Sequence, residues 1–276
     1  MERSVARIEA AGPPGRSAPT HSNRLVVAPE NFAAHSPFLL MAEDWFAPPA
    51  GFPTHPHRGM ETVTLVLEGA MEHRDHTGAH GLLSQGDVQW MTAGKGVMHS
   101  EMPGPNGVHS LQLWLNLPAD RKMSAARYAD QHAADAPTLA GPGYEIRVYA
   151  GRQGEIVQPH GSSYPMGLAS LRLDAGASAS LEIPADERAF LYVIEGSGLV
   201  GADKLGVAAG KVAWLDPSGQ SDSPDTLTIE ATTPMQAALF SGRPIDEPVV
   251  AYGPFVMNTQ EEIRQAFADY QKGELV

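Results

Sequence analysis

The sequence predicts an all-β protein made of two tandem jelly-roll barrels, with one helix at the C-terminus. Short segments rich in β-branched residues end at glycine turns, as in "ETVTLVLEG" (61–69), which is typical of tightly connected strands. The second half also repeats the first, because "TLVLEG" and "GDVQWMTAG" return as "FLYVIEG" and "GKVAWLDPSG". A repeat at roughly 130 residues indicates two similar β units rather than a short-repeat solenoid, and strands at this density fit barrels.

The duplication divides the chain into two predicted domains, residues 1–133 and 134–276. Alternating apolar residues in "SLQLWLNLP" (110–118) and "SLRLDAGASASLEIP" (170–184) predict strands in both halves. We expect the polar, alanine-rich tract 120–137 to be a short helix or a linker. The Pro, Gly, Ala and Arg content of the first ~20 residues suggests a loose arm.

The C-terminus carries a clear helical pattern in "TQEEIRQAFADYQKGEL" (259–275). Thr259 and Glu262 have the T-x-x-E spacing of a capping box, which satisfies the free amide groups at a helix start. Ile263, Phe267 and Tyr270 then follow on one face. We expect this apolar stripe to pack on the protein's own sheet.

Composition excludes several classes of function. The chain has no cysteine, so disulfides, thiolate catalysis and cysteine-based metal sites are absent. Its formal net charge of −13 argues against direct nucleic-acid binding, which requires clustered Lys and Arg. No apolar run approaches the ~18–20 residues of a membrane span, and the N-terminus lacks a secretory signal. We therefore expect a cytoplasmic protein, or a nuclear one in a eukaryote, that does not contact a membrane.

Two short motifs point to a metal site in the first half. His55 and His57 stand two apart in "PTHPHRGME", and His99 and Glu101 stand two apart in "VMHSEMP". Residues two apart on a strand point to the same face, so two such strands would aim three imidazoles and a carboxylate at one point. Such a ligand set suits one divalent ion, Fe(II), Mn, Ni, Cu or Zn, with positions left open.

The identity of the carboxylate ligand stays open at this point. On an unbroken strand Glu61 would share the face of His55 and His57, and would rival Glu101. Gly59 could bulge the strand and turn Glu61 away. Spacing alone does not choose between the two glutamates.

The remaining histidines are expected to be structural or exposed. Of the 11 histidines only His160 lies beyond residue 132, so the second half cannot build a site with several histidines. We expect a solvated hairpin loop to hold His73, His76 and His80, although His73 or its neighbours could support the metal ligands. The others expected to have structural or surface roles are His21, His35, His109, His132 and His160.

Four stretches make the sequence resemble the pirin family of bicupins. They are "GFPTHPHRGMETVTLVLEG", "GDVQWMTAGKGVMHSEMP", "LQLWLNLP" and "PVVAYGPFVMNTQEEIRQAFADYQKG". The resemblance implies two cupin barrels that face each other, with a metal, expected to be iron, in the first alone. It also implies the ligands His55, His57, His99 and Glu101, with Glu61 as the ligand of the general cupin pattern. Met60 departs from the family, where Phe is common at this position.

Two activities are associated with proteins of this family. One is that of quercetin 2,3-dioxygenase, which opens a flavonol with O2; here Glu101 would take the hydroxyl proton, and Phe52, Met60 and Trp90 would line the substrate pocket. The alternative is a non-enzymatic, iron-dependent or redox-sensing protein that regulates a protein partner in transcription or metabolism. An open path to the metal would favour catalysis, and a sealed site would favour sensing.

Overall fold

The computed structural model describes residues 1–159 and 161–276, and it forms two compact units. The first barrel consists of Pro13–Ala134, Gly161–Tyr164 and Ile245–Val276. The second barrel consists of Met1–Gly12, Asp135–His160 and Pro165–Pro244. The chain therefore enters each unit more than once. The division at residues 133 and 134 stays a prediction, and His160 lies outside the described residues.

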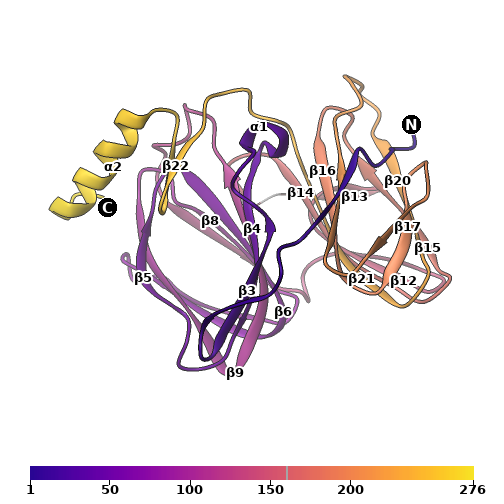
Figure 1. The fold of residues 1–276 in the computed structure, drawn as a ribbon, viewed down its shortest axis with the longest axis horizontal. Coiled ribbons are helices and arrows are strands. Elements are labelled where there is room, and N and C mark those ends of the chain that lie inside the picture. The colour runs from indigo at the N-terminus through magenta and orange to yellow at the C-terminus, as the bar shows by residue number, and fades with distance from the viewer. Residues whose placement is uncertain (160) are drawn as a thin grey trace. The chain divides into compact units, whose positions relative to one another are not determined.

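The first barrel is an antiparallel sheet with a short helix, a small hairpin and the C-terminal helix (Figure 1). The order in the large sheet is β10-β8-β6-β9-β4-β3-β2, with β5 paired to β9 and β7 paired to β6. Its elements are β2 (Gly15–Ala18), β3 (His21–Val27), α1 (Phe32–His35), β4 (Phe38–Phe46), β5 (Phe52–His57), β6 (Met60–Asp75), β7 (His80–Ser84), β8 (Val88–Thr92), β9 (Val97–Asn116), β10 (Arg127–Gln131), β22 (Val250–Tyr252), β23 (Phe255–Met257) and α2 (Gln260–Lys272).

Two long strands close this barrel. β6 and β9 pair with each other over two long stretches, Met60–Val66 against Ser110–Asn116 and Met71–Asp75 against His99–Pro103, with the short pairing of Glu68 and Gly69 with His109 and Val108 between them. Register shifts at Val66/Glu68 and Gly69/Met71 separate the two stretches and bend the strands. One continuous strand, β9, therefore supplies residues to both ends of the same inner face.

The second barrel contains a large and a small antiparallel sheet. The large sheet has the order β1-β19-β16-β21-β14-β12-β11, with β13 on β12, and the small one has the order β15-β20-β17-β18. The strands are β1 (Arg7–Ala10), β11 (Thr138–Gly141), β12 (Tyr144–Gln153), β13 (Ile156–Gln158), β14 (Met166–Leu173), β15 (Ser178–Ile183), β16 (Arg188–Glu195), β17 (Ser197–Val200), β18 (Leu205–Ala208), β19 (Lys211–Leu215), β20 (Asp225–Ala231) and β21 (Met235–Gly242). A continuous aliphatic core fills the space between them.

The sequence repeat corresponds to a repeat of turn geometry. Gly69, at a register shift within β6, and Gly196, between β16 and β17, have φ of 74° and 75°. Gly86 and Gly210, which begin the second matching segments, have φ of 84° and 76°. Such left-handed conformations strain any residue with a Cβ, so glycine is required at all four positions. The predicted all-β fold with two similar units is confirmed.

The expectation of a helix or linker over 120–137 is wrong in part, because β10 forms there. Arg127–Gln131 pairs antiparallel with β8, which would otherwise present an open edge. The ladder hydrogen bonds and the packing of Tyr128 against the core outweigh the helical preference of the alanines.

The N-terminal arm is also not loose. Arg7–Ala10 forms β1 against β19, and the buried Arg3 donates to Asp225 at 2.7 Å. These contacts order a segment whose composition suggested disorder.

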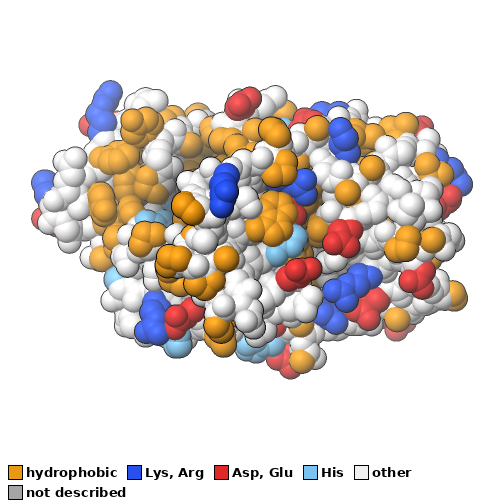
Figure 2. Space-filling view, turned by 60° about the horizontal axis from the view of Figure 1, so that its bottom comes forward, with side chains coloured by type: hydrophobic (Ala, Val, Ile, Leu, Met, Phe, Trp, Pro, Cys, Tyr) orange, Lys and Arg blue, Asp and Glu red, His pale blue; other side chains and the backbone are white. Residues whose placement is uncertain are grey.

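The C-terminal helix α2 begins and ends as its sequence predicts. Thr259 and Glu262 form the capping box, and Gly273 closes the helix in the left-handed conformation with φ 74°. Ile263 and Ala266 are buried, whereas Tyr270 is 42% exposed, so the packed stripe is shorter than predicted. None of the described helices is long and apolar enough to cross a membrane. On the face shown in Figure 2, the described Lys and Arg side chains are interspersed with Asp and Glu.

A buried lysine fixes the loop between β5 and β6. Lys122 is 1% exposed, and its Nζ donates to the Gly59 carbonyl at 2.9 Å, Asn116 Oδ1 at 2.7 Å and the Val256 carbonyl at 3.2 Å. Burial lowers its pKa from 10.5 to about 8, while Glu247 and Glu262 oppose that shift.

This shift predicts a particular pH dependence of stability. Between pH 8 and 10.5 the unfolded chain binds the Lys122 proton more tightly than the folded chain, so folding stability should rise with pH across this window. From pH 8 to 10.5 the free energy of unfolding of the wild type should rise, relative to that of Lys122→Met, by on the order of 2 kcal/mol. Urea unfolding of both proteins across the window measures this difference. Parallel pH profiles would contradict it.

Candidate metal centre

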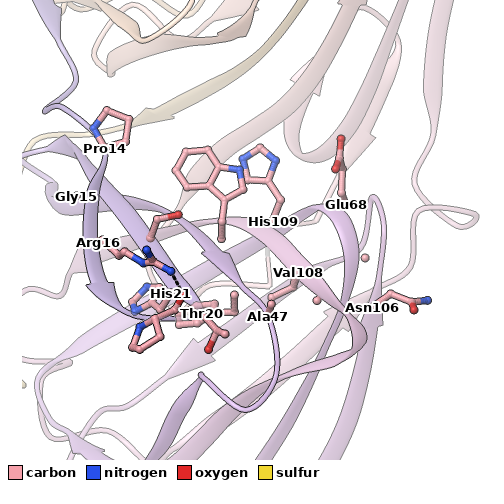
Figure 3. A pocket seen from close by; sticks show the side chains of 16 residues that line it. Pro14, Gly15, Arg16, Thr20, His21, Ala47, Glu68, Asn106, Val108 and His109 are labelled. Atoms are coloured by element: carbon pink, nitrogen blue, oxygen red, sulfur yellow. Dashed lines mark hydrogen bonds between the residues drawn. The ribbon is translucent and has the colours of Figure 1, made fainter.

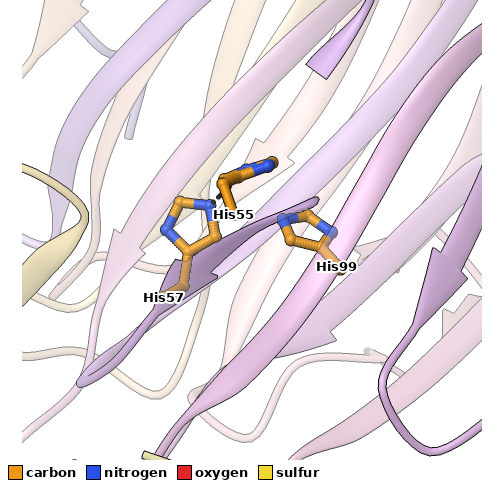
Figure 4. Close-up of side chains that lie close together, drawn as sticks. All are labelled: His55, His57 and His99. Atoms are coloured by element: carbon orange, nitrogen blue, oxygen red, sulfur yellow. Dashed lines mark hydrogen bonds between the residues drawn. The ribbon is translucent and has the colours of Figure 1, made fainter. Parts of the chain in front are cut away.

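The four predicted ligands lie on two neighbouring strands, β5 and β9. His55 stands directly opposite His99 in the antiparallel register, and His57 stands opposite Val97. Because His55 and His57 are two apart and His99 faces His55, all three imidazoles lie on one face of the sheet. Figure 4 shows the three side chains turned toward one another. The three histidines of the two motifs therefore lie together.

The three histidines form a compact nitrogen cluster. One ligand atom from each lies within 4.8 Å of the others, and the Nε2 atoms of His55 and His57 are 3.1 Å apart. Two nitrogens bound at right angles to one ion, each about 2.1 Å away, would lie about 3 Å from each other. The separation therefore fits two ligands of a single metal ion.

Hydrogen bonding indicates where the lone pairs lie. His55 Nδ1 lies 2.8 Å from the Pro53 carbonyl, which can only accept, so this nitrogen carries the proton and Nε2 the lone pair. His99 Nε2 is buried and has no hydrogen-bond partner among the described residues. A proton shared between Nε2 of His55 and Nε2 of His57 would leave Nε2 of His99 without a partner among the described residues. A cation would instead be bound by one nitrogen of each of the three histidines. The cluster can therefore hold a metal ion.

Burial keeps these imidazoles neutral, as metal ligation requires. His57 and His99 are 2% and 1% exposed. Burial, with a contribution from His55, lowers the pKa of His57 to about 3, and the Pro254 carbonyl opposes this. Burial also lowers the pKa of His55, and burial with the neighbouring histidines lowers that of His99.

Glu101 lies on the strand of His99 but outside the group of three histidines. It is 2% exposed, and Gln112 Nε2 donates to both of its oxygens, at 2.8 and 3.0 Å. Burial raises the pKa of Glu101 to about 7, against hydrogen bonds from Gln112 and Thr64, and the charge of Asp44 adds to the rise. Its ligand role stays a prediction, and its carboxyl group has a proton affinity suited to exchange near neutral pH.

The rival carboxylate, Glu61, has a different set of partners. Gly59, with φ 79°, breaks the strand between His57 and Glu61. Glu61 is fully buried and accepts from Thr92 Oγ1 at 2.5 Å, Ser163 N at 2.7 Å and Ser163 Oγ at 2.6 Å; Ser162 Oγ also donates to it. These bonds attach the segment Gly161–Tyr164 to the first barrel.

The three predicted pocket residues lie in different surroundings. The ring of Phe52 is 5.8 Å from that of His55. Met60 is fully buried in a cluster with Leu39, Met91, Ala93, Val97 and Val256. Trp90 is 2% exposed and packs against Gly161. The substrate-lining role of all three stays a prediction, and only for Phe52 does a described ring contact reach a histidine of the cluster.

A surface hollow of about 750 Å³ lies near this aromatic contact (Figure 3). Its wall includes His21 and Phe46, whose rings stack at 3.9 Å, and Trp45 and His109, whose rings stack at 4.6 Å. Phe52 touches the ring of Phe46 at 5.0 Å on one side and that of His55 on the other. One aromatic layer thus links the hollow to the histidine cluster.

The other histidines mostly have ordinary partners. His21 pairs with Asp44 at 2.7 Å and His109 with Glu43 at 2.8 Å, which fits structural roles. The expectation of a loop at 73 is wrong, because β6 continues through His73 and buries it to 2% exposure. Its neighbour Tyr128, on β10, was missed because the sequence around it has no strand alternation. Among the described residues, the second barrel holds no comparable histidine group.

The fold and the site define the class of protein: a bicupin, with a candidate metal centre in one of its two barrels. Residues 22–115 match the family described as Pirin, and residues 168–276 match the Pirin C-terminal cupin domain. The chain belongs to the pirin family.

Relatives and solved structures support the assignment to the pirin family. The chain is 42% identical over 241 residues to a "Pirin-like protein" of Solanum lycopersicum, covering 86% of this chain and 81% of that one. It is 38% identical over 291 residues to a Pseudomonas aeruginosa protein named "Putative quercetin 2,3-dioxygenase", covering 99% and 98%. The crystal structure of quercetin 2,3-dioxygenase from Acinetobacter baumannii matches with a TM-score of 0.90 at 29% identity, covering 100% of this chain and 98% of that one.

The contacts of Glu61 predict that it supports the fold and not the metal. Glu61→Ala should lower the free energy of unfolding by about 2–4 kcal/mol, because several buried donors lose their acceptor. The amount of metal bound per folded molecule of Glu61→Ala should equal that of the wild type. Glu68→Ala, an exposed position on the same strand, is the matched control for stability. Loss of metal without loss of stability would make Glu61 the carboxylate ligand.

Proposed function

We propose that this protein is a metal-dependent dioxygenase that opens a flavonol such as quercetin with O2. The observation that carries the proposal is the group of three neutral histidines with converging nitrogens beside a carboxyl group of raised pKa. The relatives and the solved structure named for quercetin 2,3-dioxygenase support the choice of substrate.

In this proposal His55, His57 and His99 hold one divalent ion, with Glu101 as the fourth ligand. The ion is Fe(II), as the family resemblance implies. When bound, it supplies Lewis acidity that makes the 3-hydroxyl group of the flavonol easier to deprotonate.

Glu101 then has a defined part in the reaction. In the metal-free protein burial raises the pKa of Glu101 to about 7. A carboxylate two residues from His99 can accept the hydroxyl proton, and Gln112 holds its oxygens while it does so. The reaction adds both atoms of O2 to the flavonol and releases one carbon as carbon monoxide.

Access to the cluster supports catalysis over a sealed sensor. His57 and His99 are buried, but His55 is half-buried and follows the exposed residues Pro53 and Thr54. A small planar molecule can therefore approach the cluster from the His55 side, next to Phe52.

The first test is to purify the protein without chelators, assay its metal and follow loss of the flavonol absorbance band in air with and without Fe(II). Iron-dependent decay is expected. At saturating iron, Glu101→Gln should lower the turnover rate by about 10²–10⁴-fold, the usual contribution of a general base. Bound iron without turnover of any flavonol would refute the dioxygenase and favour a metal-dependent regulator.

A second prediction concerns His57. His57→Ala should lose bound metal and flavonol turnover together, because it removes one of three nitrogens from a single site. His80→Ala, at a half-exposed histidine that pairs with Glu72, is the matched control and should retain both. Full turnover by metal-depleted His57→Ala would contradict the proposed site.

A further inference from the structure

His73 is a further histidine beside the cluster, and it is buried. It lies on β6 directly opposite Glu101 of β9, two pairs away from the pair that contains His99. Its Nε2 is 3.0 Å from Nδ1 of His99, which is hydrogen-bond distance. His73 does not belong to the group whose nitrogens converge, so its contact is with the back of one ligand.

The direction of this hydrogen bond decides what His99 can do. If His99 donates from Nδ1, its Nε2 keeps a lone pair facing the cluster. If His73 donates, the proton of neutral His99 moves to Nε2, where it is buried with no described partner and blocks a cation. Only the first arrangement makes His99 a ligand.

The surroundings of His73 hold it in place. The ring of Tyr128 packs against it at a centroid distance of 4.7 Å, and the ring of His99 lies at 5.1 Å on another side. Tyr128 is itself fixed by the pairing of β10 with β8, opposite Met91. His73 is thus held between a residue of β10 and a histidine of the cluster.

We propose that His73 is a positioning residue that holds His99 with its proton on Nδ1 and so directs Nε2 at the ion. The proposal rests on the metal site of the proposed function. Metal-bound histidines usually donate their second N–H to a carboxylate, a carbonyl or water. A neutral imidazole in this place fixes the ligand without adding a negative charge to the site.

The first experiment needs no metal. In the metal-free protein, nitrogen NMR of the imidazole side chains reports which nitrogen of His99 carries the proton. Nδ1–H is expected in the wild type and in His73→Gln, whose amide oxygen can still accept. His73→Phe should give a mixture of both forms, and His80→Phe should match the wild type. A wild-type His99 with its proton on Nε2 would overturn the proposal.

The second experiment measures the affinity for Co(II), a stable probe of divalent ion binding, by calorimetry. His73→Phe should bind Co(II) about 10–100-fold more weakly, the usual effect of losing such a partner. His73→Gln should recover most of the loss, and His80→Phe should show none. Equal affinities in wild type and His73→Phe would overturn the role of His73.

The two experiments separate this proposal from the proposed function. A wild type that binds no Co(II) would refute the metal site, while the NMR result would still decide the role of His73. A wild type that binds Co(II) with no effect of His73→Phe would refute the role of His73 alone. If His73→Phe does not fold, the protonated nitrogen of His99 in the wild type decides the role of His73.

Discussion

The register of β5 against β9 is the constraint on which the candidate centre depends. His55 faces His99 across the strands, and a shift by one residue would turn His55 and His57 to the opposite face. The bulge between Phe52 and His55, and the double pairing of β9 with β6, fix that register from both sides. Backbone hydrogen bonds far from the imidazoles therefore decide whether their nitrogens meet.

Two buried glutamates in this barrel show how partners separate a structural role from a reactive one. Glu61 accepts hydrogen bonds from a threonine and two serines. Glu101 accepts from Gln112, whose amide reaches both oxygens, and from Thr64, and burial raises its pKa to about 7. Glu61 therefore joins the segment Gly161–Tyr164 to the barrel, whereas Glu101 is the candidate for proton exchange.

Local patterns predicted most of the fold and the histidines of the site. The glycine turns, the alternating strands and the capping box at Thr259 each depend on a few neighbouring residues, so the sequence alone predicts them. The strand Arg127–Gln131 cannot be predicted in this way, because it forms by pairing with β8, which is distant in sequence. The sequence predicts a loop at His73, because the length of β6 depends on its pairing with β9 beyond Gly69. Long-range pairing, absent from any local window, accounts for these errors.

The buried Arg58, next to His57, gives the order of the chain a consequence for how the first barrel folds. Its guanidinium donates to Asp269 at 2.7 Å and to the Leu275 carbonyl at 3.4 Å, so the C-terminal segment is part of the first barrel. Arg58 and Asp269 are 211 positions apart, and the strands of the second barrel from β11 to β21 lie between them in sequence. Contacts of such long sequence separation form slowly, because the entropy of closing the loop is lost before the contact is made.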